Sequence, residues 1–362
     1  MPSIPTEPGR AAWLLGTSEP PRGPRDSVEF AEACAFALSA WQVLPAVAPR
    51  LLAWGGRRRA GDPAAQRVRD RLVGLDVLGR VQLRICARLI ETFQQRGIPY
   101  AMLKGSAVRF AAYPDPKLRV GKDFDIAVPR RLLRRAEEAT RDCGFIAAQW
   151  DPATKRFHLA DPVLRARVEA QHYELGFLVR RQLATGIIAA EEAAIRRDLD
   201  SQFIWHLTEQ DELACYVSVD LHHGLSLEVD VEPLVERAAA IDWDGLPVRL
   251  PPPEWTLFHV IYKIYWEGVH NYGKGAYQFA DLVRLIPATS EATFARLLEI
   301  LRQYRLEAAG YYVLRRLSRN FGVSPRPEVE AFLERASHPP PELEPLQVND
   351  LGDMWPKLWS AR

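Results

Sequence analysis

The segment Tyr100–Val128 constrains the fold of this chain most, because it places two aspartates two residues apart at the start of an apolar run. It reads YAMLKGSAVRFAAYPDPKLRVGKDFDIAV. In a β-strand, residues two apart point to the same face, so Asp123 and Asp125 would present two carboxylates side by side. Such carboxylates repel each other unless a cation lies between them, and hard divalent ions prefer oxygen ligands. The segment therefore predicts a strand that carries a metal site.

The same segment predicts a phosphate site. Gly105 and Ser106 stand between an apolar run and a helical pattern, so they would open a helix. A helix N-terminus offers free backbone N–H groups and a partial positive charge, which suit a phosphate. Glycine also lets the backbone approach the phosphate closely. A phosphate site followed closely by a metal site indicates phosphoryl or nucleotidyl transfer.

Four short motifs follow one another in this segment. They are Leu-Lys-Gly ending at Gly105, Tyr-Pro-Asp-Pro from Tyr113, a single Arg119, and Asp-x-Asp-hydrophobic from Asp123. A bare Asp-x-Asp occurs often by chance, whereas the combined string is specific. It resembles the nucleotidyltransferase superfamily, the fold of DNA polymerase β and the aminoglycoside nucleotidyltransferases. The longer match is to one bacterial branch, the uncharacterised nucleotidyltransferase family, over roughly residues 95–290.

Nucleotidyl transfer uses two metals about 3.5–4 Å apart, and a third carboxylate from a neighbouring strand usually holds the second metal. Asp220 fits best, because Cys215–His222 reads as a strand that alternates polar and apolar residues. The family has an Asp-Leu-His string here, so the resemblance also assigns this role to Asp220. His222 shares its face and would orient a carboxylate, bind substrate, act as a base or be structural. Should Asp220 lie more than about 8 Å from the aspartate pair, the role would pass to Glu169 or Glu174.

Several basic and aromatic residues are candidates for nucleotide contacts. Lys104 either adds charge to the phosphate site or is a solvated strand-end residue. Arg119 and Lys122 either neutralise the triphosphate or pair with nearby aspartates. In the C-terminal region, Lys274 and Tyr277 lie three residues apart, on one helical face. The resemblance implies that such a helix closes over the nucleotide. The nucleotide-binding candidates are Lys104, Gly105, Ser106, Lys274 and Tyr277.

Composition excludes some classes of function. The chain has 47 basic and 46 acidic residues and a net charge of +1, which gives no electrostatic basis for nucleic-acid binding. No apolar run reaches the ~18 residues of a membrane span, and the first ten residues lack a signal-peptide pattern. We expect a cytoplasmic protein without membrane contact. The four cysteines form no Cys-x-x-Cys motif, which predicts reduced, buried thiols: Cys34, Cys86, Cys143 and Cys215.

The chain of 362 residues predicts an α/β (α+β) fold, with a small mixed-sheet catalytic domain flanked by helical regions. Strands are expected at residues 98–103, 124–128, 145–150 and 215–222, and helices at 105–113 and 131–143. The expected organisation is a disordered tail at 1–25, a helical region at 26–95, the catalytic domain at 96–250 with a mixed insertion at 152–212, a helical domain at 251–338 and a proline-rich tail at 339–362.

Together these observations predict a nucleotidyltransferase that uses Mg²⁺ or Mn²⁺ and ATP or another NTP. It would move a nucleoside monophosphate to an unknown small-molecule, peptide or protein acceptor and release pyrophosphate. Asp123 and Asp125 would bridge the metals, and Asp220 would assist the second one. Three alternatives remain open: phosphoryl transfer on the same fold, modification of a protein or peptide, and a non-catalytic nucleotide-binding module.

Overall fold

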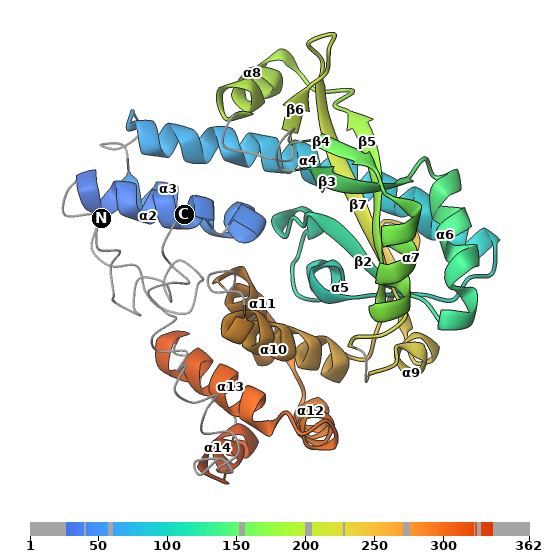
Figure 1. The fold of residues 1–362 in the computed structure, drawn as a ribbon. Helices are drawn as coiled ribbons and strands as arrows, with labels where there is room; N and C mark the ends of the chain where they lie inside the picture. The colour runs from blue at the N-terminus through green and yellow to red at the C-terminus, as the bar shows by residue number, and fades with distance from the viewer. Residues whose placement is uncertain are drawn as a thin grey trace. The chain divides into compact units, whose positions relative to one another are not determined.

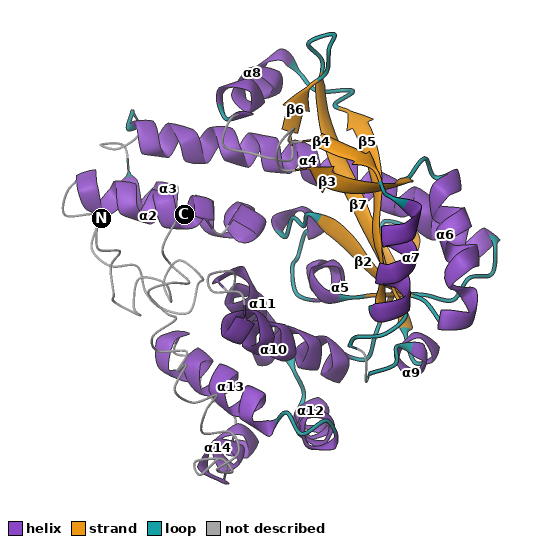
Figure 2. Cartoon of the chain, in the orientation of Figure 1, coloured by secondary structure: helices purple, strands orange, loops and turns teal. Residues whose placement is uncertain are grey.

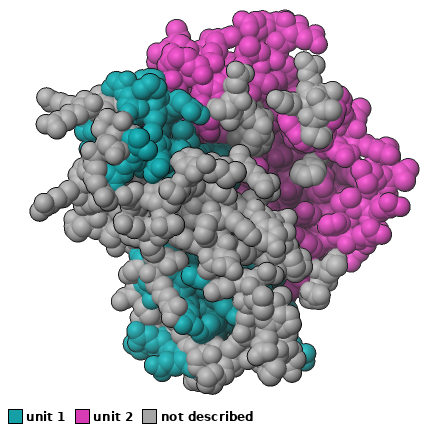
Figure 3. All heavy atoms as spheres, turned by 60° about the vertical axis from the view of Figure 1, so that its left-hand side comes forward, with its two compact units in different colours: residues 1–69, 253–362 teal, residues 70–252 magenta. Residues whose placement is uncertain are grey.

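The computed structural model describes residues 27–39, 41–56, 61–151, 156–199, 205–226, 229–270, 276–321, 323 and 327–335. The chain divides into two compact units, which Figure 3 colours separately. We call residues 70–252 the sheet unit, and residues 1–69 with 253–362 the helical unit. The expected tails at 1–25 and 339–362 lie outside the described residues. The expected domain boundaries stay predictions. Along the chain, the two units change over after Arg69 and before Pro253.

A mixed sheet forms the centre of the sheet unit (Figures 1 and 2). Its strands lie in the order β1-β2-β7-β5-β3-β4, and β6 also pairs with β7. Strands β2 and β7 run parallel, whereas the other described pairs within this sheet are antiparallel. The bounds are Ala101–Met102 (β1), Asp123–Ala127 (β2), Ile146–Asp151 (β3), Arg156–Leu159 (β4), Glu174–Leu183 (β5), Trp205–Leu207 (β6) and Leu213–His222 (β7).

One face of this sheet is part of the hydrophobic core, because apolar residues alternate with polar ones along its central strands. Phe124 and Ile126 on β2, and Val217, Val219 and Leu221 on β7, are almost completely buried. The alternate residues of these strands carry the polar groups. The polar face of β2 and β7 is therefore the face on which a site can form.

Helices and a hairpin complete the sheet unit. Helix α6 packs against β7, and the long helix α4 lies beside α6, since Thr92 Oγ1 is 3.3 Å from Cys143 Sγ. The elements are α4 (Pro63–Gln95, which begins in the helical unit), α5 (Lys104–Ala111), η3 (Pro116–Leu118), η4 (Arg130–Leu132), α6 (Leu133–Asp142), α7 (Pro162–Gln171), α8 (Ala189–Arg197), α9 (Glu232–Glu236) and the hairpin β8–β9 (Ala239–Trp243 and Leu246–Leu250).

The helical unit is built around buried aromatic side chains. Phe258, Phe279, Phe294 and Phe321 are at most 1% exposed, and the rings of Phe279 and Phe321 stack. Helix α12 begins regularly, because the Ser290 hydroxyl accepts the Thr293 N–H. The elements are α2 (Ser27–Ser39), η1 (Trp41–Val43), α3 (Leu44–Gly55), α10 (Pro253–His270), α11 (Ala276–Ala288), α12 (Glu291–Gln303), α13 (Glu307–Phe321) and α14 (Pro327–Arg335).

The predicted mixed α/β class is confirmed, and each strand expected from the sequence has a counterpart in the sheet. The segment 152–212 is more regular than expected. It supplies β5, which lies between β7 and β3 inside the sheet, as well as helices such as α8. Its run of charged residues hid this strand, because the alternation that marks a half-buried strand is interrupted by a register shift between Leu175 and Leu178.

The cysteine prediction agrees with the structure. All four thiols are free and buried. Burial raises the pKa of the Cys86 thiol to about 12, so this thiol stays protonated and unreactive. Among the described helices, no single one is both long and apolar enough to span a membrane; only the bent pair α2 and α3 passes, when taken together.

Candidate active site

The parallel strands β2 and β7 bring the predicted carboxylates together. Their register sets Asp125 opposite Asp220, and Asp123 opposite Ser218. Neighbouring strands lie about 4.8 Å apart, so the side chains of Asp125 and Asp220 project next to each other from one face. His222 shares that face, two residues after Asp220. One ligand atom from each of Asp125, Asp220 and His222 lies within 4.8 Å of the others.

Asp220 has the features of a metal ligand. The residue is 7% exposed, and its Oδ1 accepts no hydrogen bond from any described residue. Burial raises the pKa of Asp220 well above its usual value, and the charges of Asp123, Asp125 and Glu174 raise it further. A buried oxygen without a partner is costly, and a hard divalent cation satisfies it. The site therefore fits a divalent metal ion, with ligand atoms of Asp125, Asp220 and His222 close enough to share it; the part of Asp123 in metal binding stays a prediction.

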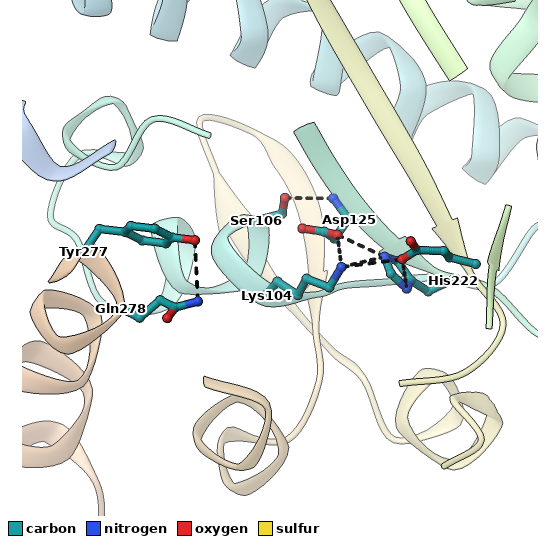
Figure 4. Close-up of polar contacts among 7 residues, drawn as sticks. Lys104, Ser106, Asp125, His222, Tyr277 and Gln278 are labelled. Carbon is teal, nitrogen blue, oxygen red and sulfur yellow. Dashed lines mark hydrogen bonds and ion pairs between the residues drawn. The ribbon is translucent and has the colours of Figure 1, made fainter. Parts of the chain in front are cut away.

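Lys104 points toward Asp125 and His222 (Figure 4). Its Nζ lies 2.6 Å from Asp125 Oδ1 and 3.7 Å from Glu174 Oε2. Burial alone would lower the pKa of Lys104, but the charges of Asp125, Glu174 and Asp220 outweigh burial and raise it. Lys104 is therefore a charged, paired residue of the site and not a solvated one. Its predicted contact with the nucleotide stays a prediction.

His222 is completely buried between two acids. Its Nε2 lies 2.9 Å from Asp125 Oδ1, and its Nδ1 lies 3.4 Å from Glu174 Oε2 in a geometry that forms no hydrogen bond. The ring stacks on Tyr173. Burial lowers the pKa of His222, and the charge of Lys104 lowers it further. The imidazole is therefore neutral, the form that ligates metals or donates a single ring N–H to Asp125.

Glu174 is the residue of this group that the sequence analysis named only as a substitute for Asp220. In the structure, Glu174 lies in the same group as Asp220, because β5 pairs with β7 and sets Glu174 opposite His222. The sequence signal that could have placed Glu174 at the site is its position at the start of the strand Glu174–Leu183. The sequence analysis did not predict that strand. Glu169, the other substitute, lies on α7 and pairs with Arg134.

The start of helix α5 borders the site. The Ser106 Oγ accepts the Asp125 N–H at 3.1 Å, and Ser106 is buried. The first-turn N–H groups of Gly105 and Ser106 have no partner within the helix, as at any helix N-terminus. A Cβ on Gly105 would lie 3.0 Å from the guanidinium of Arg119. The glycine therefore lets a buried arginine approach the helix start, where a phosphate would bind.

The two C-terminal candidates belong to the helical unit. Lys274 lies outside the described residues. Tyr277 lies in the first turn of α11, and its hydroxyl accepts a hydrogen bond from Gln278 Nε2 at 3.4 Å (Figure 4). The nucleotide contacts of Lys274 and Tyr277 stay predictions.

Comparisons with known proteins agree with the resemblance found in the sequence. The family model described as "Uncharacterised nucleotidyltransferase" matches residues 32–322. No curated protein matches the chain. Among solved structures, the antibiotic-resistance factor ANT(2'')-Ia is similar over 63% of this chain and 95% of its own, with 11% identity and a TM-score of 0.34. A nucleotidyltransferase-like protein from Paracoccidioides brasiliensis is similar over 65% of this chain and 92% of its own, with 14% identity and a TM-score of 0.27.

Proposed function

The chain belongs to the uncharacterised nucleotidyltransferase family, and we propose that it transfers a nucleoside monophosphate from an NTP to an acceptor in a Mg²⁺-dependent reaction. The observation that carries this proposal is the pair Asp125 and Asp220, in register on neighbouring parallel strands, with a buried Asp220 oxygen that has no hydrogen-bond partner among the described residues. Asp123, two residues before Asp125, supplies the third carboxylate.

Each group of residues in the site has its own proposed role. Asp123, Asp125 and Asp220 hold the divalent ion, which when bound polarises the triphosphate and activates the attacking oxygen. The backbone N–H groups of Gly105 and Ser106 bind the distal phosphates at the start of α5, and Arg119 beside Gly105 adds positive charge there.

In the reaction itself, a hydroxyl or similar nucleophile of the acceptor forms a bond to the α-phosphorus. The bond from the α-phosphorus to the oxygen bridging to the β-phosphate breaks, and pyrophosphate leaves with that electron pair. The nucleophile releases its proton to water. Asp220 would assist this release as a ligand of the divalent ion, through a buried oxygen that accepts no hydrogen bond from the described residues.

The test follows two labelled phosphates. The protein is incubated with Mg²⁺, with NTPs labelled at the α- or the γ-phosphate, and with fractions of small molecules, peptides and proteins as acceptors. We expect the α-label on an acceptor, together with pyrophosphate, and mass spectrometry then identifies the adduct. Transfer of the γ-label with release of NDP would show phosphoryl transfer instead. Nucleotide binding without transfer of either label would show that the protein is a non-catalytic nucleotide-binding module.

A matched pair of variants links the activity to the site. Asp125→Asn removes a charge from the site, whereas Asp142→Asn removes one from an ion pair whose aspartate side chain is 57% exposed. The first variant should abolish the transfer, and the second should leave it intact. Equal activity in both variants would contradict the proposal.

A further inference from the structure

A lysine makes a close charge contact with a carboxylate of the candidate active site. Lys104 Nζ lies 2.6 Å from Asp125 Oδ1 and 3.1 Å from His222 Nε2. Asp125 also offers one of the ligand atoms of the candidate metal site. The ammonium group of Lys104 therefore occupies the surroundings of an oxygen that a divalent ion would use.

The backbone fixes Lys104 in this position. Both main-chain groups of Asp125 bond to residues that flank Lys104: Leu103 N–H donates to Asp125 O at 2.9 Å, and Ser106 Oγ accepts the Asp125 N–H. Lys104 itself has a φ of +49°, in the left-handed region that residues with a Cβ rarely adopt. A strained backbone of this kind persists where the surrounding structure imposes it, often at functional sites. The lysine is therefore held against the residue that its side chain binds.

The charges around Lys104 show what its ammonium group does. Four carboxylates contribute to this part of the site, and His222 between them is neutral. Lys104 lies within ion-pair distance of two of them, Asp125 and Glu174, and its side chain is 13% exposed. A positive charge at this distance from a metal ligand repels a divalent ion strongly, because water screens it little. The carboxylates are those of Asp123, Asp125, Glu174 and Asp220.

We propose that Lys104 is a built-in counter-ion, which competes with the divalent ion for Asp125 and keeps the metal affinity of the nucleotide-free site low. This inference rests on the proposed function, since it needs the carboxylates to bind a metal. It differs from two simpler roles. A lysine that contacts only phosphate would not change metal binding in the absence of nucleotide. A lysine that only supports the fold would weaken metal binding when it is replaced.

The experiment measures Mn²⁺ binding to the full chain without nucleotide, by electron paramagnetic resonance or calorimetry. Lys104→Met removes the charge, and Lys104→Gln removes it while keeping a donor for Asp125, which guards against a folding defect. Both variants should bind Mn²⁺ about tenfold more tightly or better, given the Coulomb energy of charges a few ångströms apart. Lys104→Arg keeps the charge and should resemble the wild type.

Two controls locate the effect. Lys117→Met removes another paired lysine of the sheet unit, which lies 3.4 Å from Asp115 and is 37% exposed, and it should leave Mn²⁺ affinity unchanged. Adding Asp220→Asn to the wild type or to Lys104→Met should abolish the binding, which assigns the ion to this site.

Each outcome decides the matter. Tighter binding in both neutral Lys104 variants, with Lys117→Met unchanged, supports the counter-ion. If the wild type binds Mn²⁺ and both neutral Lys104 variants bind it equally or more weakly, the counter-ion role is overturned, whereas the metal site remains supported. Absence of Mn²⁺ binding in the wild type and in every variant overturns both the counter-ion and the metal part of the proposed function.

Discussion

Asp125 on β2 and Asp220 on β7 lie opposite each other in a parallel register, and both side chains are nearly buried. Parallel pairing with a one-to-one register sets like charges side by side, which a sheet tolerates only when something offsets their repulsion. Lys104 offsets part of it. The two aspartates therefore favour binding of a cation but lower the stability of the metal-free protein, and the first prediction tests this effect.

Asp220→Asn should increase stability while it destroys activity. The neutral amide removes one negative charge from a buried group of carboxylates. Metal-free protein should therefore gain about 1–3 kcal/mol in the free energy of unfolding, equivalent to about one to two pKa units of charge repulsion. Transfer should fall about 100-fold or more, as when one electrostatic group of an active site is lost. Urea unfolding in EDTA and the α-label assay measure the two effects. A variant that is destabilised and active would contradict this reading of the site.

A second prediction concerns the close approach of Arg119 to the backbone of Gly105. In Gly105→Ala the new Cβ would lie 3.0 Å from the guanidinium, so the arginine must shift by a few tenths of an ångström. Gly105→Val must displace it further and block the helix start. NTP affinity, measured by calorimetry, should therefore fall in the order wild type, Ala, Val.

The control for this series is Gly79→Ala. Its Cβ would lie 3.4 Å from the nearest atoms of Lys117, at ordinary contact distance inside α4. This change should leave NTP affinity unchanged. Unchanged affinity in Gly105→Val would show that the phosphate does not bind at this helix start.

The sequence could predict which faces of the strands carry the aspartates, because this signal is local. Alternation in Cys215–His222 identified the face that carries Asp220, and the spacing of Asp123 and Asp125 identified the face of β2. Pairing between strands far apart in the chain leaves no local trace, so their parallel register came only from the structure. The resemblance to a family supplied the expectation that the two strands are neighbours.

Three features of the site were beyond sequence reasoning for physical reasons. Glu174 depends on β5, whose alternation a register shift interrupts. The orientation of Lys104 depends on a left-handed backbone, which propensities favour for glycine and not for lysine. Ser106 was expected to bind phosphate, and its bond to the Asp125 N–H depends on how α5 packs on β2. Each feature follows from tertiary packing.

The third prediction separates stability from catalysis. Helices α4 and α8 are joined by two reciprocal arginine–aspartate pairs: Arg71 with Asp198, and Arg197 with Asp70. Asp198→Ala leaves the buried Arg71 without its carboxylate and should reduce the free energy of unfolding by about 3–5 kcal/mol. Activity per folded molecule should stay unchanged, since neither residue belongs to the site.

The exposed pair Arg96–Asp142 is the matched comparison for Asp198→Ala, because its two side chains are 40% and 57% exposed. Asp142→Ala should change stability by only about 0–1 kcal/mol. Urea unfolding of the two variants tests the contrast. Similar losses in both would show that burial does not set the strength of the Arg71–Asp198 pair.

A fourth prediction rests on sequence alone. Lys274 stands between Gly273 and Gly275, and glycine-flanked loops often close over bound ligands. Lys274→Ala should weaken binding of an NTP more than binding of the corresponding NMP, which lacks the distal phosphates. Calorimetry with both nucleotides measures the difference. Equal weakening would show that Lys274 does not contact the distal phosphates, and no weakening would leave it a solvated loop lysine.

The last prediction concerns His222, whose Nε2 lies 2.9 Å from Asp125 Oδ1 while its ring stacks on Tyr173. His222→Phe keeps the stacking and most of the volume, but it removes the nitrogen that ligates a metal or orients the carboxylate. His222→Gln keeps a polar group that can reach Asp125. Groups that orient metal ligands typically contribute about 10–100-fold to metal affinity or activity. We therefore expect Mn²⁺ affinity to decrease from wild type to Gln to Phe, with the Phe variant lowest by that factor.

The neighbouring His223 provides the control, because alternation along the chain turns its side chain away from the face of Asp220. His223→Gln should bind Mn²⁺ and transfer the α-label like the wild type. Thermal unfolding of each variant shows whether a loss of binding reflects a loss of folded protein. If His222→Phe is folded and binds Mn²⁺ as the wild type does, the buried imidazole neither ligates the ion nor positions Asp125, and the ion is held by the carboxylates alone.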